Sequence, residues 1–147
     1  MNSIRLHTGF TLVELLLSVA LITVLLGMSM PVYRTLYVDN DLEIIASITA
    51  DTLRRAQVLS YANEGNSSWG VHVSSNSIVL FKGSSFAARD TNFDEVSALS
   101  PGIIPSGITD IVYTRLTGLP QTTGSITLTT NSGAKTISIN AKGMVDY

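Results

Sequence analysis

The residues from Phe10 to Tyr33 form an apolar run that contains a single charged residue, Glu14. At about 1.5 Å per residue, a helix over this run would be roughly 36 Å long, enough to span the hydrocarbon core of a bilayer. Hydroxyl side chains within a helix are tolerated in lipid because they can donate to carbonyls one turn earlier, and the run contains Thr11, Ser18, Thr23 and Ser29. The run therefore predicts a transmembrane helix at residues 10–33.

The charges on the two sides of this run predict its orientation. A short polar leader, Met1–Gly9, carries Arg5 and His7, whereas three acidic residues follow the run, Asp39, Asp41 and Glu43. By the positive-inside rule, the amino end lies in the cytoplasm and the rest of the chain lies outside it. The mean hydropathy of +0.33 is high for a purely soluble domain and agrees with a segment in lipid.

Two alternatives to a specialised membrane helix are a cleaved secretory signal and a plain single-pass anchor. The run exceeds the 7–15 apolar residues typical of a signal peptide, and Gly27–Pro31 is a poor match to a small-x-small cleavage site. Glu14 argues against a plain anchor, because an unpaired carboxylate in a membrane helix costs about 2.5–3.5 kcal/mol on insertion scales. Another group must therefore compensate the charge of Glu14.

The segment Gly9-Phe10-Thr11-Leu12-Val13-Glu14 resembles the signature of the type IV pilin superfamily, which includes type IV pilins and the pseudopilins of type II secretion. The resemblance implies that a membrane prepilin peptidase cleaves between Gly9 and Phe10 and that the leader Met1–Gly9 is discarded. It also implies that the new terminal Phe10 is N-methylated. Pro31 resembles a family proline that kinks the helix, and the alternative is a simple helix terminator.

A physical role for Glu14 follows from this processing. The free α-amine of Phe10 stays cationic after methylation, so it can neutralise Glu14 of a neighbouring subunit inside a filament. A subunit in the wrong axial position would leave both charges unpaired in an apolar bundle, at a cost of about 3–5 kcal/mol. Glu14 is thus predicted to control assembly.

After Tyr33 the pattern becomes amphipathic and predicts that the helix continues to about Ala62. Its apolar face comprises Val38, Leu42, Ile45, Ile48, Leu53, Ala56 and Leu59. Four charged residues lie opposite this face: Asp39, Glu43, Asp51 and Arg54. On the polar side, Asp51 and Arg55 have the i, i+4 spacing of an ion pair, and the alternative is a solvated pair that contributes little. One face of this helix should therefore pack on a globular domain.

The second half of the chain has the period-two pattern of strands. A hairpin is predicted at residues 69–73 and 78–81, followed by strands at Ile111–Leu116, Ser125–Thr130 and Lys135–Asn140. The residues between Lys82 and Gly107 should be a long irregular loop with one short strand at Glu95–Leu99. The predicted fold class is α+β, a long N-terminal helix packed on a small antiparallel β-sheet, with one pilin-like domain at residues 34–147.

The composition and motifs do not indicate enzymatic chemistry. The chain has no cysteine, its net charge is −2, and it lacks phosphate-binding and dinucleotide-binding motifs, so we expect no enzyme activity, no cofactor and no nucleic-acid partner. His72 stands alone in a predicted strand, and we expect it to be a packed or exposed residue rather than a metal ligand or a catalytic base. Residues Asp90–Asp94 have the opening spacing of a calcium loop but lack its glycine and its closing glutamate.

A weaker resemblance to the minor-pilin branch, the H-type pseudopilins of type II secretion, covers Leu53–Gln57, Trp69–Val71 and Ile139–Gly143. Some relatives in that branch bind DNA through a glycine-arginine motif, which residues 142–146 lack. The resemblance implies three kinds of protein partner: other pilin or pseudopilin subunits, prepilin peptidase and an inner-membrane assembly platform. Membrane lipid is a further partner. It also implies location in the bacterial inner membrane and then in a filament. We therefore expect a structural subunit of a type IV pilus or a type II secretion pseudopilus, in the role of a minor subunit that primes or caps assembly. The alternatives are a major pilin and an anchored module that captures DNA or a secreted substrate through the 82–107 loop.

Overall fold

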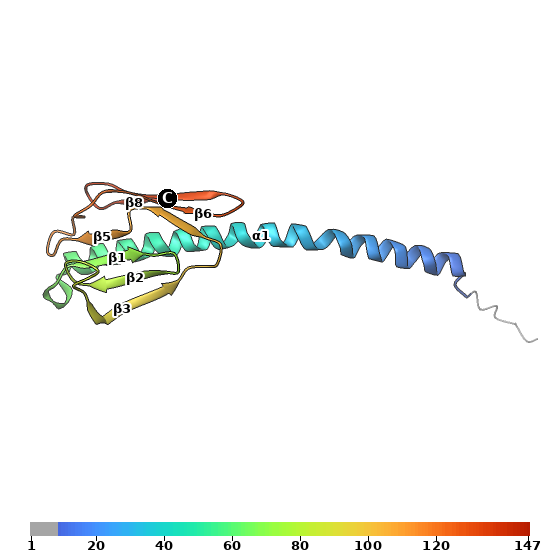
Figure 1. Ribbon diagram of the computed structural model, residues 1–147, viewed down its shortest axis with the longest axis horizontal. Coiled ribbons are helices and arrows are strands. Elements are labelled where there is room, and N and C mark those ends of the chain that lie inside the picture. The colour runs from blue at the N-terminus through green and yellow to red at the C-terminus, as the bar shows by residue number, and fades with distance from the viewer. Residues whose placement is uncertain (1–8) are drawn as a thin grey trace, which may run out of the picture. The chain divides into compact units, whose positions relative to one another are not determined.

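The computed structural model describes the backbone of residues 9–147 and the side chains of residues 9–27 and 41–147. Over these residues, a long helix, α1 (Leu12–Tyr61), and a short 3-10 turn, η1 (Glu64–Asn66), precede the strands (Figure 1). The strands are β1 (Trp69–Val73), β2 (Ser77–Lys82), β3 (Asp90–Ala98), β4 (Ile104–Gly107), β5 (Asp110–Tyr113), β6 (Gly124–Thr129), β7 (Ala134–Ile139) and β8 (Val145–Asp146). The predicted α+β class is confirmed. The chain divides into two compact units, residues 1–37 and residues 38–147.

Helix α1 ends close to the predicted residue Ala62, where the backbone turns into the left-handed region. Asn63 has a φ of 57° and Gly65 a φ of 60°. The buried hydroxyl of Ser60 accepts the backbone N–H of Trp69 at 2.8 Å. The last turn of α1 is therefore fixed directly to the first residue of β1.

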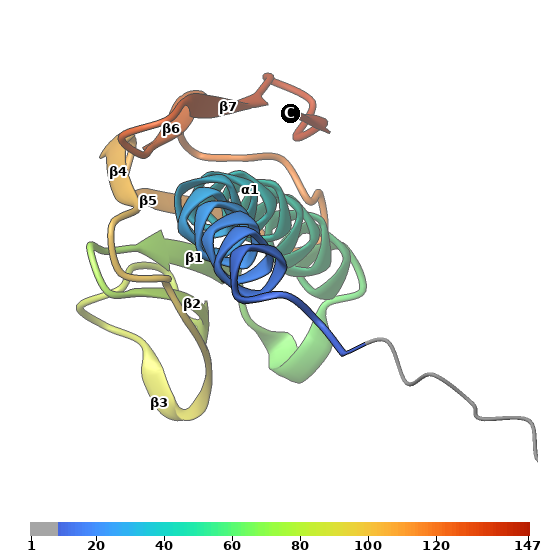
Figure 2. The same ribbon diagram turned by 90° about the vertical axis from the view of Figure 1, so that its right-hand side faces the viewer.

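The strands of the second unit form two antiparallel sheets rather than the one sheet predicted. Sheet A has the strand order β3-β2-β1-β5, and sheet B has the order β4-β6-β7-β8. The two sheets flank α1 on different sides (Figures 1 and 2). The sequence did not reveal β4, which contains Pro105 and Gly107, or β8, which has only two residues, because neither shows a period-two pattern.

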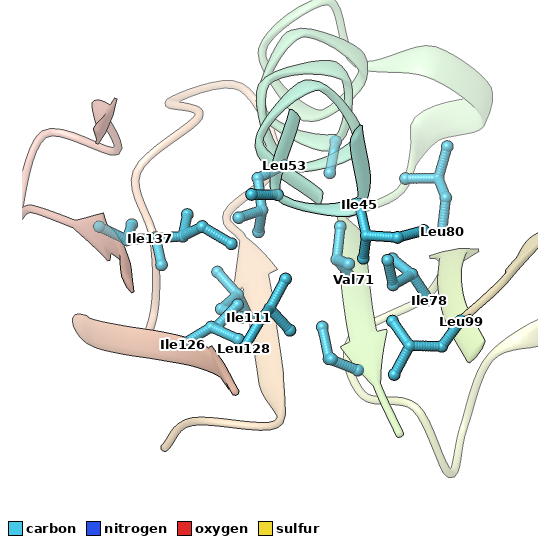
Figure 3. Close-up of a cluster of buried hydrophobic side chains, with 14 of the residues drawn as sticks. Ile45, Leu53, Val71, Ile78, Leu80, Leu99, Ile111, Ile126, Leu128 and Ile137 are labelled. Atoms are coloured by element: carbon cyan, nitrogen blue, oxygen red, sulfur yellow. The ribbon is translucent and has the colours of Figure 1, made fainter. Parts of the chain in front are cut away.

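The core lies where one face of α1 meets both sheets. Side chains from α1, sheet A and sheet B point toward one another in a single cluster (Figure 3). On the predicted apolar face, Leu42, Ile45, Leu53 and Ala56 are buried, whereas Ile48 and Leu59 are partly buried against the cluster. This part of the amphipathic pattern is confirmed, and Val38 lies outside the described side chains.

The predicted ion pair between Asp51 and Arg55 is wrong. Asp51 accepts from Arg54 at 3.0 Å, and Arg55 instead makes two hydrogen bonds with Glu95 of β3, at 2.6 and 2.7 Å. The planar guanidinium matches both oxygens of a carboxylate, so the tertiary partner replaces the weaker contact along the helix.

The segment predicted as one long loop between Lys82 and Gly107 contains two strands, β3 and β4. Strand β3 begins at Asp90, five residues before the predicted short strand, and its pairing with β2 is irregular between Leu80 and Lys82. The predicted loop was too long because charged and polar residues at a solvent-facing edge conceal the strand pattern.

Asp90 and Asp94, the two carboxylates of the partial calcium motif, have protein partners instead. Asp94 accepts from Arg89 at 2.8 Å, and Asp90 accepts from Asn92. Within the described residues, no three acidic or histidine side chains lie close enough to hold a metal ion.

Sheet A has a second buried layer on the face away from α1. Residues 83–89 cover this face, and the ring of Phe86 stacks on His72 with centroids 3.8 Å apart and meets Phe81 edge to face. His72 also contacts Asp110 at 2.9 Å. Gly70 makes the layer possible, because a Cβ there would lie 2.5 Å from the Phe81 ring. The prediction that His72 is a packed residue is confirmed, and Asp110 is a partner that the sequence did not reveal.

The strand predicted at Ile111–Leu116 ends at Tyr113. Leu116 has a φ of 69°, and its N–H donates to the carbonyl of Ser60 at 2.9 Å. This bond to the end of α1 holds residues 114–119 in a turn and prevents the strand from continuing.

Candidate processing and assembly site

Gly9 and Phe10 lie immediately before α1, outside regular secondary structure, and both are exposed. A Cβ built on Gly9 would meet no atom within 4 Å. The fold therefore places no demand on a glycine at this position. Because proteases need access to the backbone of the bond they cut, the exposed, non-helical Gly9–Phe10 peptide suits processing.

Thr11 sets the start of α1. Its hydroxyl accepts the backbone N–H of Glu14 at 3.3 Å, and its carbonyl accepts the N–H of Leu15 at 3.1 Å. Thr11 is thus the N-cap, a role that our sequence analysis missed although threonine followed three residues later by glutamate is the sequence pattern of a capping box. Because of this cap, α1 begins at Leu12, two residues after Phe10.

Glu14 lies in the first turn of α1, and its side chain is exposed. The positive end of the helix dipole favours a carboxylate at this position. One turn later, the hydroxyl of Ser18 donates to the carbonyl of Glu14 at 2.7 Å, and that of Thr23 donates to Val19 at 2.7 Å. These bonds leave the carboxylate of Glu14 at the surface of an otherwise apolar helix.

The apolar side chains that surround Glu14 are exposed in the single chain. Twelve large ones between Phe10 and Leu26 have exposed fractions of 55–79%. They are Phe10, Leu12, Val13, Leu15, Leu16, Leu17, Val19, Leu21, Ile22, Val24, Leu25 and Leu26. This segment needs an apolar environment, because so much exposed apolar surface is unfavourable in water.

Among the described residues, no helix is both long and apolar enough to cross a membrane. The transmembrane helix at residues 10–33 stays a prediction. Pro31 lies within the helical bounds of α1 but outside the described side chains, so its predicted kink also stays a prediction.

Comparison with known protein families matches residues 4–30 to the prokaryotic N-terminal methylation motif. The match includes Gly9, Phe10 and Glu14. The chain is a type IV pilin-like protein. No curated protein and no solved structure matches it.

The motif supports a processed subunit of the pilin or pseudopilin kind, which associates with other pilin subunits. It points to a structural role and to a membrane-anchored pilus subunit. In this pilin-like chain, the structure brings Gly9, Phe10, Thr11 and Glu14 together within the last residues before α1 and its first turn.

Proposed function

We propose that this pilin-like chain is a subunit of a type IV pilus or a type II secretion pseudopilus, anchored in the inner membrane by residues 10–33 before assembly. Prepilin peptidase removes residues 1–9, and Phe10 is then N-methylated. The observation that carries the proposal is the exposed, non-helical Gly9–Phe10 peptide next to an apolar helix whose first turn holds Glu14. The methylation motif at residues 4–30 supports the same reading.

The proposed assembly mechanism pairs two charges across subunits. Removal of the leader creates a cationic amine at Phe10, and the carboxylate of Glu14 on an adjacent subunit neutralises it. Both groups are surrounded by apolar side chains, so two opposite charges attract strongly when they lie close together, and each is costly when left unpaired. The two charges lie close together only when the two copies are in register. The pair therefore selects the correct axial position of an incoming subunit at the assembly platform.

Replacing Gly9 tests the processing step. Gly9→Leu leaves the fold unchanged, because a side chain there meets no atom within 4 Å, but it blocks access to the scissile bond. We expect the variant to keep its leader, seen as a higher intact mass of the membrane-extracted protein. Gly27→Leu is the matched control, because Gly27 is also surrounded by open space. Efficient trimming of Gly9→Leu would contradict the proposed cleavage site.

We further propose that the chain is a minor subunit that primes or caps assembly. The lack of cysteines supports this role, because many major pilins carry a disulfide loop near the carboxyl end. The resemblance of residues 53–57 and 139–143 to H-type pseudopilins also supports it. Purified filaments should contain the chain in trace amounts relative to another pilin. A filament made mainly of this chain would identify it as the major pilin instead.

A further inference from the structure

Thr11 is a polar residue in an apolar setting. Its neighbours Phe10, Leu12 and Val13 carry large apolar side chains that are 72–79% exposed. The Thr11 hydroxyl accepts the backbone N–H of Glu14 at 3.3 Å, and no other interaction of this hydroxyl is found among the described residues. A hydroxyl in apolar surroundings is costly unless it is hydrogen-bonded, so the bond to Glu14 gives this one a specific role.

The bond of Thr11 satisfies a donor that an α-helix leaves unpaired at its start. The first four N–H groups of a helix have no acceptor within the helix. In α1, the N–H of Leu15 donates to the carbonyl of Thr11 at 3.1 Å. The N–H of Glu14 comes one residue earlier, and the Thr11 hydroxyl is its acceptor. Thr11 therefore defines where α1 begins.

Without this hydroxyl, the start of α1 would move toward the scissile bond. In an α-helix each N–H donates to the carbonyl four residues earlier. The N–H of Glu14 would then donate to the carbonyl of Phe10, and the N–H of Val13 would donate to the carbonyl of Gly9. The second of these carbonyls belongs to the Gly9–Phe10 peptide. A longer helix would therefore engage the group that the peptidase attacks.

We propose that Thr11 is a positioning residue for leader removal, because its cap begins α1 at Leu12 and keeps the carbonyl of Gly9 out of the helix. This inference rests on the proposed function. Leader removal is a hydrolysis. The oxygen of a water molecule bonds to the carbonyl carbon of Gly9, the C–N bond breaks, and the nitrogen of Phe10 takes a proton and leaves as a free amine. A carbonyl held in a helix is shielded from this attack, and proteolysis accordingly concentrates in loops and chain ends.

The backbone around the scissile bond agrees with this role. Residues 9–11 lie outside regular secondary structure, although a helix of 50 residues begins directly after them. Gly9 acts in the same direction as the cap, because glycine is a poor helix former. The two residues together keep the Gly9–Phe10 peptide non-helical next to a long helix.

Removing the hydroxyl without changing the shape of the side chain tests the role. Thr11→Val is nearly isosteric but cannot accept the N–H of Glu14, whereas Thr11→Ser retains the cap. In membranes that contain prepilin peptidase, the intact mass of the full-length chain over time gives the rate of leader removal. We expect Thr11→Val to be trimmed about threefold to fivefold more slowly than the wild type, as the loss of a typical N-cap implies. Thr11→Ser should be trimmed at the wild-type rate.

Thr23→Val is the matched control. The Thr23 hydroxyl donates to the carbonyl of Val19 at 2.7 Å in the interior of the same helix. The variant loses a threonine hydrogen bond from α1 but leaves the start of the helix in place, so it should be trimmed at the wild-type rate. Equal rates for Thr11→Val and the wild type would overturn the inference, and so would slow trimming of Thr11→Ser.

A spectroscopic measurement separates the backbone effect from direct recognition of the hydroxyl by the peptidase. The ¹³C chemical shifts of Phe10, in the labelled full-length chain in detergent, report whether this residue is extended or helical. We expect non-helical values in the wild type and in Thr11→Ser, and a change toward helical values in Thr11→Val. Slow trimming of Thr11→Val with unchanged shifts at Phe10 would show that the peptidase binds the hydroxyl itself, which would overturn the inference.

The same measurements distinguish this inference from the proposed function. If the wild-type chain is trimmed between Gly9 and Phe10 and Thr11→Val is trimmed equally fast, only the role of Thr11 is contradicted. If the wild-type chain keeps its leader, the proposed cleavage is contradicted and the role of Thr11 with it.

Discussion

Tyr113 places a phenol group in the core of the second unit. The side chain is fully buried, and its hydroxyl has no hydrogen-bond partner among the described residues. Burial disfavours the charged phenolate and raises the pKa of Tyr113 from 10.0 to about 12. One residue therefore contributes both an unsatisfied polar atom and a pH dependence at alkaline pH.

Replacing this residue tests both effects. In the unfolded chain Tyr113 loses its proton near pH 10, whereas the folded chain holds the proton to about pH 12, so stability falls as pH rises through this window. We expect Tyr113→Phe to be as stable as the wild type at pH 7 or more stable by about 1 kcal/mol. Between pH 10 and 12, the free energy of unfolding of Tyr113→Phe should fall by about 2–3 kcal/mol less than that of the wild type.

Denaturant unfolding in detergent, followed by the fluorescence of the single, buried Trp69, measures these differences. Tyr61→Phe is the control, because Tyr61 is 69% exposed and its removal should leave the pH profile unchanged. If Tyr113→Phe loses as much stability as the wild type between pH 10 and 12, the phenol of Tyr113 is not the source of the loss of stability at alkaline pH.

At the scale of elements, the second half of α1 organises the globular unit. Its buried face combines large residues such as Leu53 with alanines at positions 46, 50 and 56, all with no exposed surface. Small residues let backbones approach closely, while the large ones fill the space between the two sheets. The helix also provides charged links to the strands, from Arg55 to Glu95 of β3 and from Glu43 to Lys135 of β7.

Truncating the helix at its buried face should cost far more than truncating it at the surface. Leu53→Ala creates a cavity between α1 and the sheets, and we expect the free energy of unfolding to fall by about 2–5 kcal/mol. Ile44→Ala is the matched control on the same helix, because Ile44 is 46% exposed, and it should cost less than about 1 kcal/mol. Similar losses for the two variants in thermal or denaturant unfolding would show that the helix does not pack as described.

At the scale of the whole molecule, the two compact units differ in their chemistry. The first unit has an apolar helix with one carboxylate, and the second has a packed core of its own. Glu14 lies in the first unit and is not part of the hydrophobic core of the second. A change at Glu14 should therefore affect assembly while the fold of the second unit stays intact.

Glu14→Ala provides that separation. We expect normal insertion and trimming, but a hundredfold or greater loss from filaments, because an unpaired amine in the apolar bundle costs about 3–5 kcal/mol. Ser18→Ala is the control, since Ser18 lies one turn later and its hydroxyl bonds only to the carbonyl of Glu14 among the contacts described for it. Quantitative immunoblots of sheared filaments and of membranes measure the amount of the chain in filaments and the amount inserted and trimmed in the membrane. Wild-type levels of Glu14→Ala in filaments would contradict the pairing argument.

The amino-terminal motif, the extent of α1 and its buried face follow from the sequence alone, because they depend on hydropathy and on the spacing of neighbouring residues. Tertiary structure decided the rest. Glu95, 40 residues away, takes Arg55 from its predicted partner, and the carbonyl of Ser60 holds Leu116 in a turn instead of a strand. Partners distant in sequence leave no local pattern, so only the folded chain shows the division of the strands into two sheets.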